Sequence, residues 1–300
     1  MAAAEPASRG TTVASRSVKS IAGLAALAGR AQLHAMDFLE ADRQALAAAV
    51  RRLETPGFAG RMTALAGRPA DLVARALPGP AAGMVARAAQ SALTRALDIA
   101  LFSLRHQRFT GGRVVHSALA SACGAVGGAF GLAALAVELP VSTAIMLRAI
   151  AAVARDEGEN LGDPETGLVC LEVFALGRTG RAMAESEGGY FAVRAMLAGG
   201  LAQAADAVLN KGTAHGGSAL ALRYLSPIAT RFGAVVSEKL AAQAVAVVGA
   251  VGGAAVNLAF AEHFQDLARG HFTVRRLERV YGAEAVRAEY DRLNHEISPG

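Results

Sequence analysis

Two stretches decide the fold: residues 114–137, VVHSALASACGAVGGAFGLAALAV, and residues 240–261, LAAQAVAVVGAVGGAAVNLAFA. They hold 24 and 22 residues without a formally charged side chain when His116 is counted as neutral. About 20 apolar residues in a helix are enough to cross a bilayer. We therefore predict two long apolar helices that span a membrane, insert into it reversibly or lie buried in a soluble core.

The same hexapeptide, GAVGGA, occurs in both stretches and spaces its glycines along one helical face. Glycine has no side chain, so two helix backbones can approach closely where glycines face each other. We predict that the two helices pack on each other, or on the same helices of a second copy in a homo-oligomer. The glycines expected at this contact are Gly124, Gly127, Gly128, Gly131, Gly249, Gly252 and Gly253.

The composition of the 300-residue chain agrees with a helical protein. Hydrophobic residues make up 53%, aromatic residues only 5%, and alanine supplies nearly half of the hydrophobic total. Alanine favours helices and is depleted from strands, which argues against an all-β fold. Two cysteines are too few for a disulfide scaffold, and the low charge argues against a disordered chain. The predicted fold is all-α, a multi-helix bundle around the two glycine-rich helices.

The net charge of +5 is unevenly distributed. Residues 1–113 hold 15 basic and 7 acidic residues, whereas the remainder holds 15 and 18. A basic region beside apolar segments suits an anionic lipid surface or a membrane-protein complex. Nucleic acid is not expected as a partner, because the arginines are scattered without interleaved aromatic residues. Both cysteines lie in apolar surroundings, which fits a reducing, cytoplasmic compartment.

Three regions follow from the pattern of helices and breaks. We expect a disordered arm over residues 1–17, a basic helical region over 18–80 and a helical domain over 81–296. Within the last region, Pro140 is expected to begin a helix, Pro227 to interrupt one and Gly270 to separate two.

The strongest polar group in the sequence surrounds His263, Asp266 and His271. His263 and Asp266 share a helical face, and an imidazole with a carboxylate binds zinc or iron. His271 would complete such a site if the chain bent at Gly270. In the alternative, these side chains form a hydrogen-bond network in which Asp266 pairs with Arg269.

Two glutamates interrupt apolar helices. A carboxylate between such helices is costly unless it is paired or hydrated. Glu138 either caps the helix that follows it or forms a buried contact with Arg148 or His263. Glu172 is expected to be a second internal partner for an arginine.

Two charged stretches are expected to be solvated. The acidic turn over residues 156–160 lacks the alternating ligand pattern of a calcium-binding loop. The mixed charges over residues 275–279 are typical of a solvated helical face.

Familiar catalytic and cofactor motifs are missing from the sequence. It contains no HExxH, GxSxG, GxGxxG or GxxxxGK[ST]. We therefore expect no cofactor, and no residue is predicted to be catalytic.

Longer motifs connect the chain with a known family. ELPVST (residues 138–143), CLEVFALG (170–177) and HFQDLARGHFTVRRLE (263–278) lie in order within residues 85–290. In these motifs the chain resembles the bacterial EcsC protein family. The resemblance implies a helical protein without an established activity, named after an operon that encodes an ABC transporter involved in secretion and competence. A peptidase label sometimes accompanies the family, but no list of catalytic residues does.

The resulting hypothesis is a non-enzymatic, cytoplasmic, membrane-associated accessory protein linked to a transporter or to secretion. One alternative is a soluble metal-dependent hydrolase of the peptidase type that uses His263, Asp266 and His271. The other is a soluble helical scaffold or binding module whose apolar helices form the core.

Overall fold

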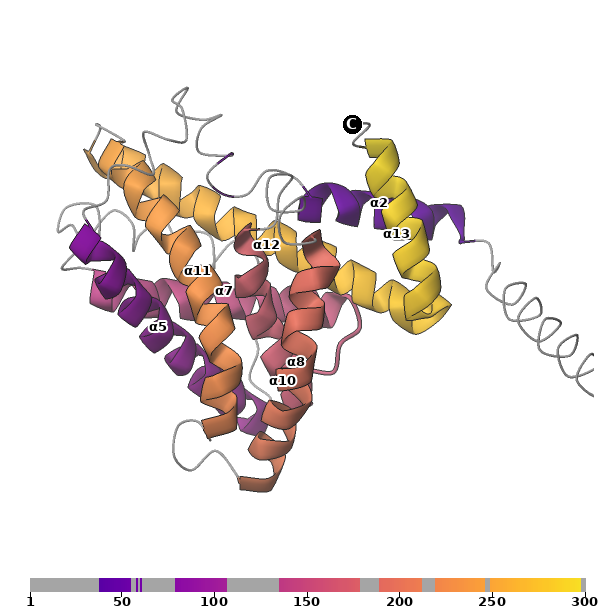
Figure 1. The fold of residues 1–300 in the computed structure, drawn as a ribbon, viewed down its shortest axis with the longest axis horizontal. Helices are drawn as coiled ribbons and strands as arrows, with labels where there is room; N and C mark the ends of the chain where they lie inside the picture. The colour runs from indigo at the N-terminus through magenta and orange to yellow at the C-terminus, as the bar shows by residue number, and fades with distance from the viewer. Residues whose placement is uncertain are drawn as a thin grey trace, which may run out of the picture.

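The computed structural model describes residues 38–54, 58, 60, 79–106, 135–178, 189–211, 219–245 and 249–297. Within these residues the chain forms eight α-helices, one 3-10 helix and no strand (Figure 1). The elements are α2 (Glu40–Glu54), α5 (Gly79–His106), α7 (Leu135–Asp156), α8 (Pro164–Glu172), η2 (Val173–Arg178), α10 (Gly189–Lys211), α11 (Ala219–Val245), α12 (Gly249–Tyr281) and α13 (Ala283–Ile297). The predicted all-α class is confirmed.

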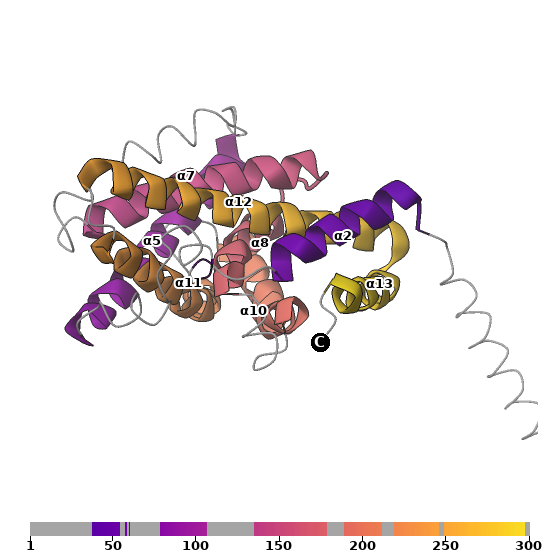
Figure 2. The same ribbon diagram turned by 90° about the horizontal axis from the view of Figure 1, so that it is seen from above.

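Helix α12 follows the long axis of the bundle and gives it two different ends (Figures 1 and 2). The starts of α5, α7 and α12 and the end of α11 gather at one end, which we name the apolar end. Helices α2 and α13 lie with the second half of α12 at the opposite end, which we name the charged end.

An aromatic cluster fills the space between η2, α11 and α12. Phe174 contacts Phe232 with ring centroids 4.9 Å apart, and Phe264 lies 5.2 Å from Phe174. Phe260 joins them through Phe264 at 5.1 Å, and Phe58 packs edge-on against Phe260 at 5.4 Å. All five rings are buried, and each contributes about 1.5–3 kcal/mol by leaving water. This cluster holds the middle of α12 in place.

Three predicted helix boundaries are wrong. Helix α7 begins at Leu135 and includes Pro140, α11 includes Pro227, and α12 continues through Gly270. A proline inside a helix removes one hydrogen bond at a cost of about 3 kcal/mol. These helices are long and buried along one side, so their side-chain packing outweighs a local break.

Two glycines allow close contact between elements. A Cβ atom at Gly270 would lie 2.7 Å from Leu53 Cγ and 3.2 Å from the carbonyl oxygen of Ala49, so glycine lets α2 cross directly over α12. A Cβ atom at Gly177 would lie 3.0 Å from the ring of Phe264. Glycine is needed at both positions because any side chain would push a neighbour away.

The two GAVGGA stretches fare differently. Residues 114–134, including Gly124, Gly127, Gly128 and Gly131, lie outside the described residues. The second stretch does not form the single helix that was predicted, because α11 ends at Val245 and α12 begins at Gly249. In the described part of the chain, no helix has both the length and the hydropathy needed to cross a bilayer. Packing through Gly249, Gly252 and Gly253, at the start of α12, stays a prediction.

Candidate functional site

A buried ion pair connects three helices near the apolar end. Lys239 of α11 donates from Nζ to Glu138 Oε1 of α7 at 2.8 Å, and its side chain is 2% exposed. Asn257 of α12 donates from Nδ2 to the same oxygen at 3.4 Å. The ammonium also lies 5.0 Å from the centroid of the Phe260 ring, a favourable cation–π position. The carboxylate is therefore compensated by contacts from two other helices.

Lys239 is the partner that sequence reasoning missed. Glu138 was expected to contact Arg148 or His263, but neither does so. Arg148 is exposed on α7, ten residues and about 15 Å of helix beyond Glu138. His263 lies three residues, just under one turn, along α12 from Phe260, and its Nε2 atom contacts the carbonyl oxygen of Gly177. The missed signal was position, since Lys239 is the charge that immediately precedes the second uncharged stretch.

The proposed metal ligands are not brought together. His263 Nε2 lies 3.0 Å from the carbonyl oxygen of Gly177, and Asp266 accepts from Arg269 at 2.8 Å. His271 Nδ1 lies 3.0 Å from the hydroxyl of Tyr190. Since α12 does not bend at Gly270, His263 and His271 remain eight residues, about 12 Å, apart along its axis. No group of three potential metal ligands occurs among the described residues.

His271 is held as a neutral imidazole. Burial, followed by the nearby charges of Arg194 and Arg275, lowers its pKa well below the ordinary value. Its Nε2 atom has no hydrogen-bond partner within the described part of the chain. Tyr190 also stacks on Tyr290 at 5.7 Å, so the imidazole belongs to a tightly packed aromatic contact between α10, α12 and α13.

Glu172 is a buried carboxyl that does not form the expected ion pair. Tyr224 donates its hydroxyl to Glu172 Oε1 at 2.9 Å. Burial raises the pKa of Glu172 to about 7, although the hydrogen bond from Tyr224 opposes part of that change. Arg194, the nearest candidate cation, instead binds Glu278 through two hydrogen bonds of 2.7 and 2.9 Å.

The acidic turn after α7 was predicted to be solvated, but its glutamates bind arginines of α12. Arg275 donates to Glu159 at 2.9 Å, and Arg276 donates to Glu157 at 2.8 Å. Arg279 also binds Glu159 and the carbonyl oxygen of Glu157. Burial opposes ionisation of Glu159, but Arg275 and Arg279 outweigh it and lower the pKa. The arginines expected to face water therefore connect helices.

Helix α2 is fastened to the same part of α12. Arg276 donates to Asp42 at 3.1 Å, and Tyr281 donates to the other oxygen of that carboxylate at 2.8 Å. These contacts, the tyrosine first, lower the pKa of Asp42. The ion pair of Arg276 thus joins α2, α12 and the acidic turn.

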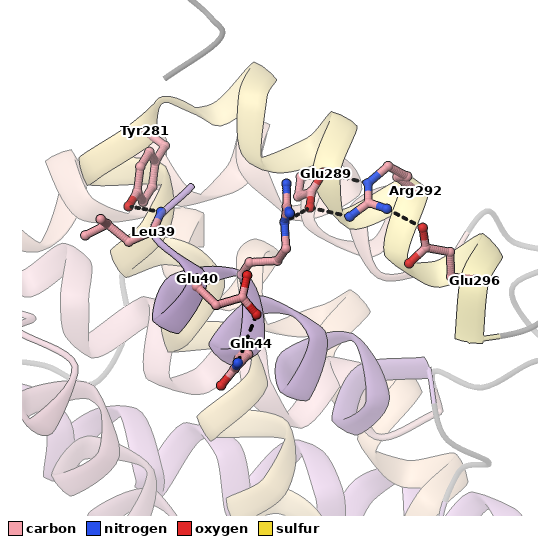
Figure 3. A network of polar contacts seen from close by, with 8 residues as sticks. Leu39, Glu40, Gln44, Tyr281, Glu289, Arg292 and Glu296 are labelled. Carbon is pink, nitrogen blue, oxygen red and sulfur yellow. Dashed lines mark hydrogen bonds and ion pairs between the residues drawn. The ribbon is translucent and has the colours of Figure 1, made fainter. Parts of the chain in front are cut away.

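Further contacts fix α2 to α13 and to the end of α12, as Figure 3 shows. The backbone N–H of Leu39 donates to the hydroxyl of Tyr281 at 3.2 Å. Arg43 donates to Glu289 at 2.9 Å, and Arg292 donates to the same carboxylate. The charged end is thus a network of ion pairs that connects three helices.

The polar groups described above hold helices together. Burial raises the pKa of Cys170 to about 12, so its thiol stays protonated and unreactive. Each of the carboxylates and imidazoles singled out by the sequence has a contact described above, with a tyrosine hydroxyl, a backbone carbonyl oxygen, a lysine or an arginine. The feature with the strongest physical constraint is the buried contact of Glu138, Lys239 and Asn257.

Comparison with known proteins gives one positive result. Residues 44–277 match the EcsC protein family, a range that begins inside α2 and ends near the end of α12. No curated protein and no solved structure matches the chain. The family match is well over half of the 300 residues. It includes the helices that contribute Glu138, Lys239 and Asn257, and the chain therefore belongs to the EcsC protein family.

Proposed function

We propose that this protein is a non-enzymatic helical accessory protein that associates with a membrane surface through its apolar end. The observation that carries the proposal is the exposure of large apolar side chains from three helices at that end. Met84 of α5 and Val141 of α7 are each 43% exposed, and Leu258 of α12 is 36% exposed. Such side chains are stabilised when they enter the boundary between lipid headgroups and acyl chains.

The charge pattern at the apolar end supports the same function. Residues 79–86, 135–147, 240–245 and 249–261 contain a single charged residue, Glu138. That carboxylate is neutralised by Lys239 inside the bundle. The helix ends can therefore approach lipid without bringing an uncompensated charge out of water. Basic residues are in excess in the first 113 residues, which favours an anionic surface.

The resemblance to the EcsC family supports a finer version of the proposal, in which the protein acts beside an ABC transporter or a secretion complex. Reversible docking at the lipid surface would raise its local concentration around such a membrane-embedded partner. The expected mode is peripheral, with the apolar end in contact with lipid and the charged end in water.

Co-sedimentation with vesicles tests the proposed function. The full chain is mixed with vesicles of phosphatidylcholine, with and without about 30% phosphatidylglycerol, and we expect binding that increases with the anionic lipid. The double variant Val141→Asp and Leu258→Asp is expected to weaken binding about tenfold or more. Val280→Asp is the matched control, because Val280 is 57% exposed at the charged end.

Two outcomes would overturn this function. Wild-type protein that remains in the supernatant with both vesicles would favour the helical scaffold instead. Equal losses for the apolar-end variant and the Val280→Asp control would show that the apolar end is not the contact surface. Circular dichroism at 222 nm checks that every variant is folded.

A further inference from the structure

A hollow of about 250 Å³ lies between α10 and α11, away from the buried ion pair. Its lining includes Met196, Gly199 and Gln203 from α10, and Leu220, Arg223 and Tyr224 from α11. In Figure 1 these two helices run side by side toward the lower tip of the bundle. The hollow thus combines one cation with apolar and amide groups.

Arg223 is an available cation in this hollow. It is exposed, and it makes no hydrogen bond or ion pair with any residue that the structure describes. None of the side chains that line the hollow is acidic, and neither is any residue in the first turn of α11. An anion that enters therefore meets a guanidinium group without a competing carboxylate.

A second hollow in the molecule shows the contrast. The hollow between α7 and α12, about 190 Å³, is lined by Asp156 and Glu157 as well as by Arg269. There the guanidinium is already bound to Asp266 and Gln265. Of these two hollows, the one between α10 and α11 is the one suited to an anion.

Apolar groups surround Arg223 on the side that faces solvent. Met196 and Leu220, which both line the hollow, are exposed large apolar side chains. A Cβ atom at Gly199 would meet nothing within 4 Å, so this part of α10 is open and free of side chain. The hollow therefore offers an apolar surface next to a positive charge, a combination that matches an amphiphile.

Tyr224 forms a fixed wall of the hollow. Its ring packs under Gly200, where a Cβ atom would approach to 3.2 Å. Its hydroxyl is directed inward and donates to Glu172 at 2.9 Å, and the carbonyl oxygen of Leu168 is a second possible acceptor at 3.2 Å. Because both ends of this side chain are held, this wall of the hollow is in place before any ligand arrives.

We propose that the hollow between α10 and α11 binds the headgroup of an anionic phospholipid. The phosphate accepts hydrogen bonds from the Arg223 guanidinium, and the polar glycerol part reaches the amide of Gln203. The acyl chains lie on Met196 and Leu220. The proposal goes beyond the proposed function, because Arg223 lies about 33 Å of helix away from Val245, the end of α11 that belongs to the apolar end. The hollow is therefore a site for a single lipid molecule, separate from the surface that the apolar end contacts.

Monomeric short-chain lipids test the site without a membrane. The full chain is titrated calorimetrically with dihexanoyl phosphatidylglycerol, dihexanoyl phosphatidylcholine and glycerol 1-phosphate, each below its aggregation limit. We expect the phosphatidylglycerol to bind tightest, because it alone combines a net negative headgroup with acyl chains. Arg223→Gln should weaken its binding about tenfold or more, through the loss of charge-assisted hydrogen bonds. Gly199→Leu should weaken both lipids by filling the hollow.

Arg148→Gln is the matched control, because it removes from α7 one exposed arginine that binds none of the described residues, and it should leave binding unchanged. Equal affinity of Arg223→Gln and wild type, equal affinity for the two lipids, or equal affinity for glycerol 1-phosphate would overturn the site. The same proteins are then tested with the vesicles described above. Vesicle binding that persists in Arg223→Gln, together with unchanged monomer binding, overturns the site but leaves the proposed function standing. Monomer binding that depends on Arg223, without vesicle binding by wild type, overturns the proposed function but supports the site.

Discussion

The two halves of α12 differ in the ion pairs beside them, which are buried at the apolar end and partly exposed at the charged end. Its first part, Gly249–Ala261, has no charged residue, and Asn257 in this part contacts the buried pair of Glu138 and Lys239. Its second half carries arginines whose side chains remain 21% to 43% exposed while they bind the acidic turn. The ion pair at the apolar end costs desolvation and tolerates no loss of a partner, whereas those at the charged end are partly hydrated and individually weak.

The two ends therefore have different effects on the fold: the buried pair fixes how the helices align, whereas the hydrated pairs only add stability. A buried pair that requires atoms from α7, α11 and α12 permits only one alignment of those helices, whereas a hydrated network permits small adjustments. Because Glu138 and Lys239 neutralise each other, the apolar end has no unpaired charge among its described residues, as contact with lipid requires. The following substitutions test whether the contacts at the two ends contribute this differently to stability.

Removal of the buried cation is expected to have the largest effect. Lys239→Met leaves the Glu138 carboxylate buried without its counter-charge, which should lower the free energy of unfolding by about 3–5 kcal/mol. Adding Glu138→Gln should restore most of that loss, because no charge then remains to be compensated. Urea denaturation followed at 222 nm measures both variants. If Lys239→Met lowered the free energy of unfolding by less than about 1 kcal/mol, the buried pair would be no stronger than the hydrated pairs, and the two ends would not differ.

A buried carboxyl without an ion pair should make stability depend on pH. The pKa of Glu172 rises from the ordinary 4.5 to about 7 in the folded protein. Between these values the unfolded chain releases the proton while the folded protein keeps it, so this residue's contribution to stability falls as pH rises from about 4.5 to 7. The total loss is roughly 3 kcal/mol, and it levels off above pH 7, where both states are ionised.

Glu172→Gln isolates that contribution. The difference in the free energy of unfolding between wild type and this variant should change across that pH range and be constant outside it. The lowered pKa values of Asp42 and Glu159 act in the opposite direction, but they occur in both proteins and cancel. A difference that does not change with pH would show that Glu172 is ionised in the folded state throughout.

Disturbing the close contact between α2 and α12 at the charged end should have an intermediate effect on stability. Gly270→Ala places a Cβ atom 2.7 Å from Leu53 and forces α2 away from α12. We expect a net loss of about 1–2 kcal/mol, since the crowding exceeds the gain in helix propensity. Gly199→Ala is the matched control in open space and should stabilise the protein by about 0.5–1 kcal/mol. Stabilisation by both variants would mean that α2 is not held tightly at this crossing.

The hydrated ion pairs should give the smallest effect. Arg276→Gln removes contacts to Asp42 and Glu157 at partly exposed positions, so the expected loss is about 1 kcal/mol or less. The loss should shrink further in 1 M NaCl, where screening acts over about 3 Å. Thermal unfolding at low and high salt measures it. A loss as large as that of Lys239→Met, and insensitive to salt, would erase the difference between the two ends.

The sequence predicted the helical class and the family well, because both depend on features spread over many residues. Alanine content and the ordered motifs each integrate weak signals along the chain. It failed at Pro140, Pro227 and Gly270, because local breakers give no information on how strongly the rest of a helix is packed. The pairing of Asp266 with Arg269 was foreseen because it is local to one helix.

The sequence did not predict which residues from distant parts of the chain form ion pairs with each other. Glu138 and Lys239 are 101 residues apart, and Arg276 and Glu157 are 119 apart. Charge patterning identifies the residues that need a partner but not the helix that supplies it. Lys239 lies at the edge of the second apolar stretch, and that position could have marked it as the cation closest to a buried carboxylate.

The paired contacts between α7 and α12 have a mechanical consequence. Glu138 contacts Asn257 at one end, and Glu157 contacts Arg276 at the other. Nineteen residues separate the two contact points on each side, about 28 Å of helix. Because the two contacts have the same spacing on both elements, a shift of one helix along the other would break both contacts at once. A displacement of α7 or α12 at the apolar end would therefore strain Arg276, which also binds Asp42 of α2 at the opposite end of the molecule.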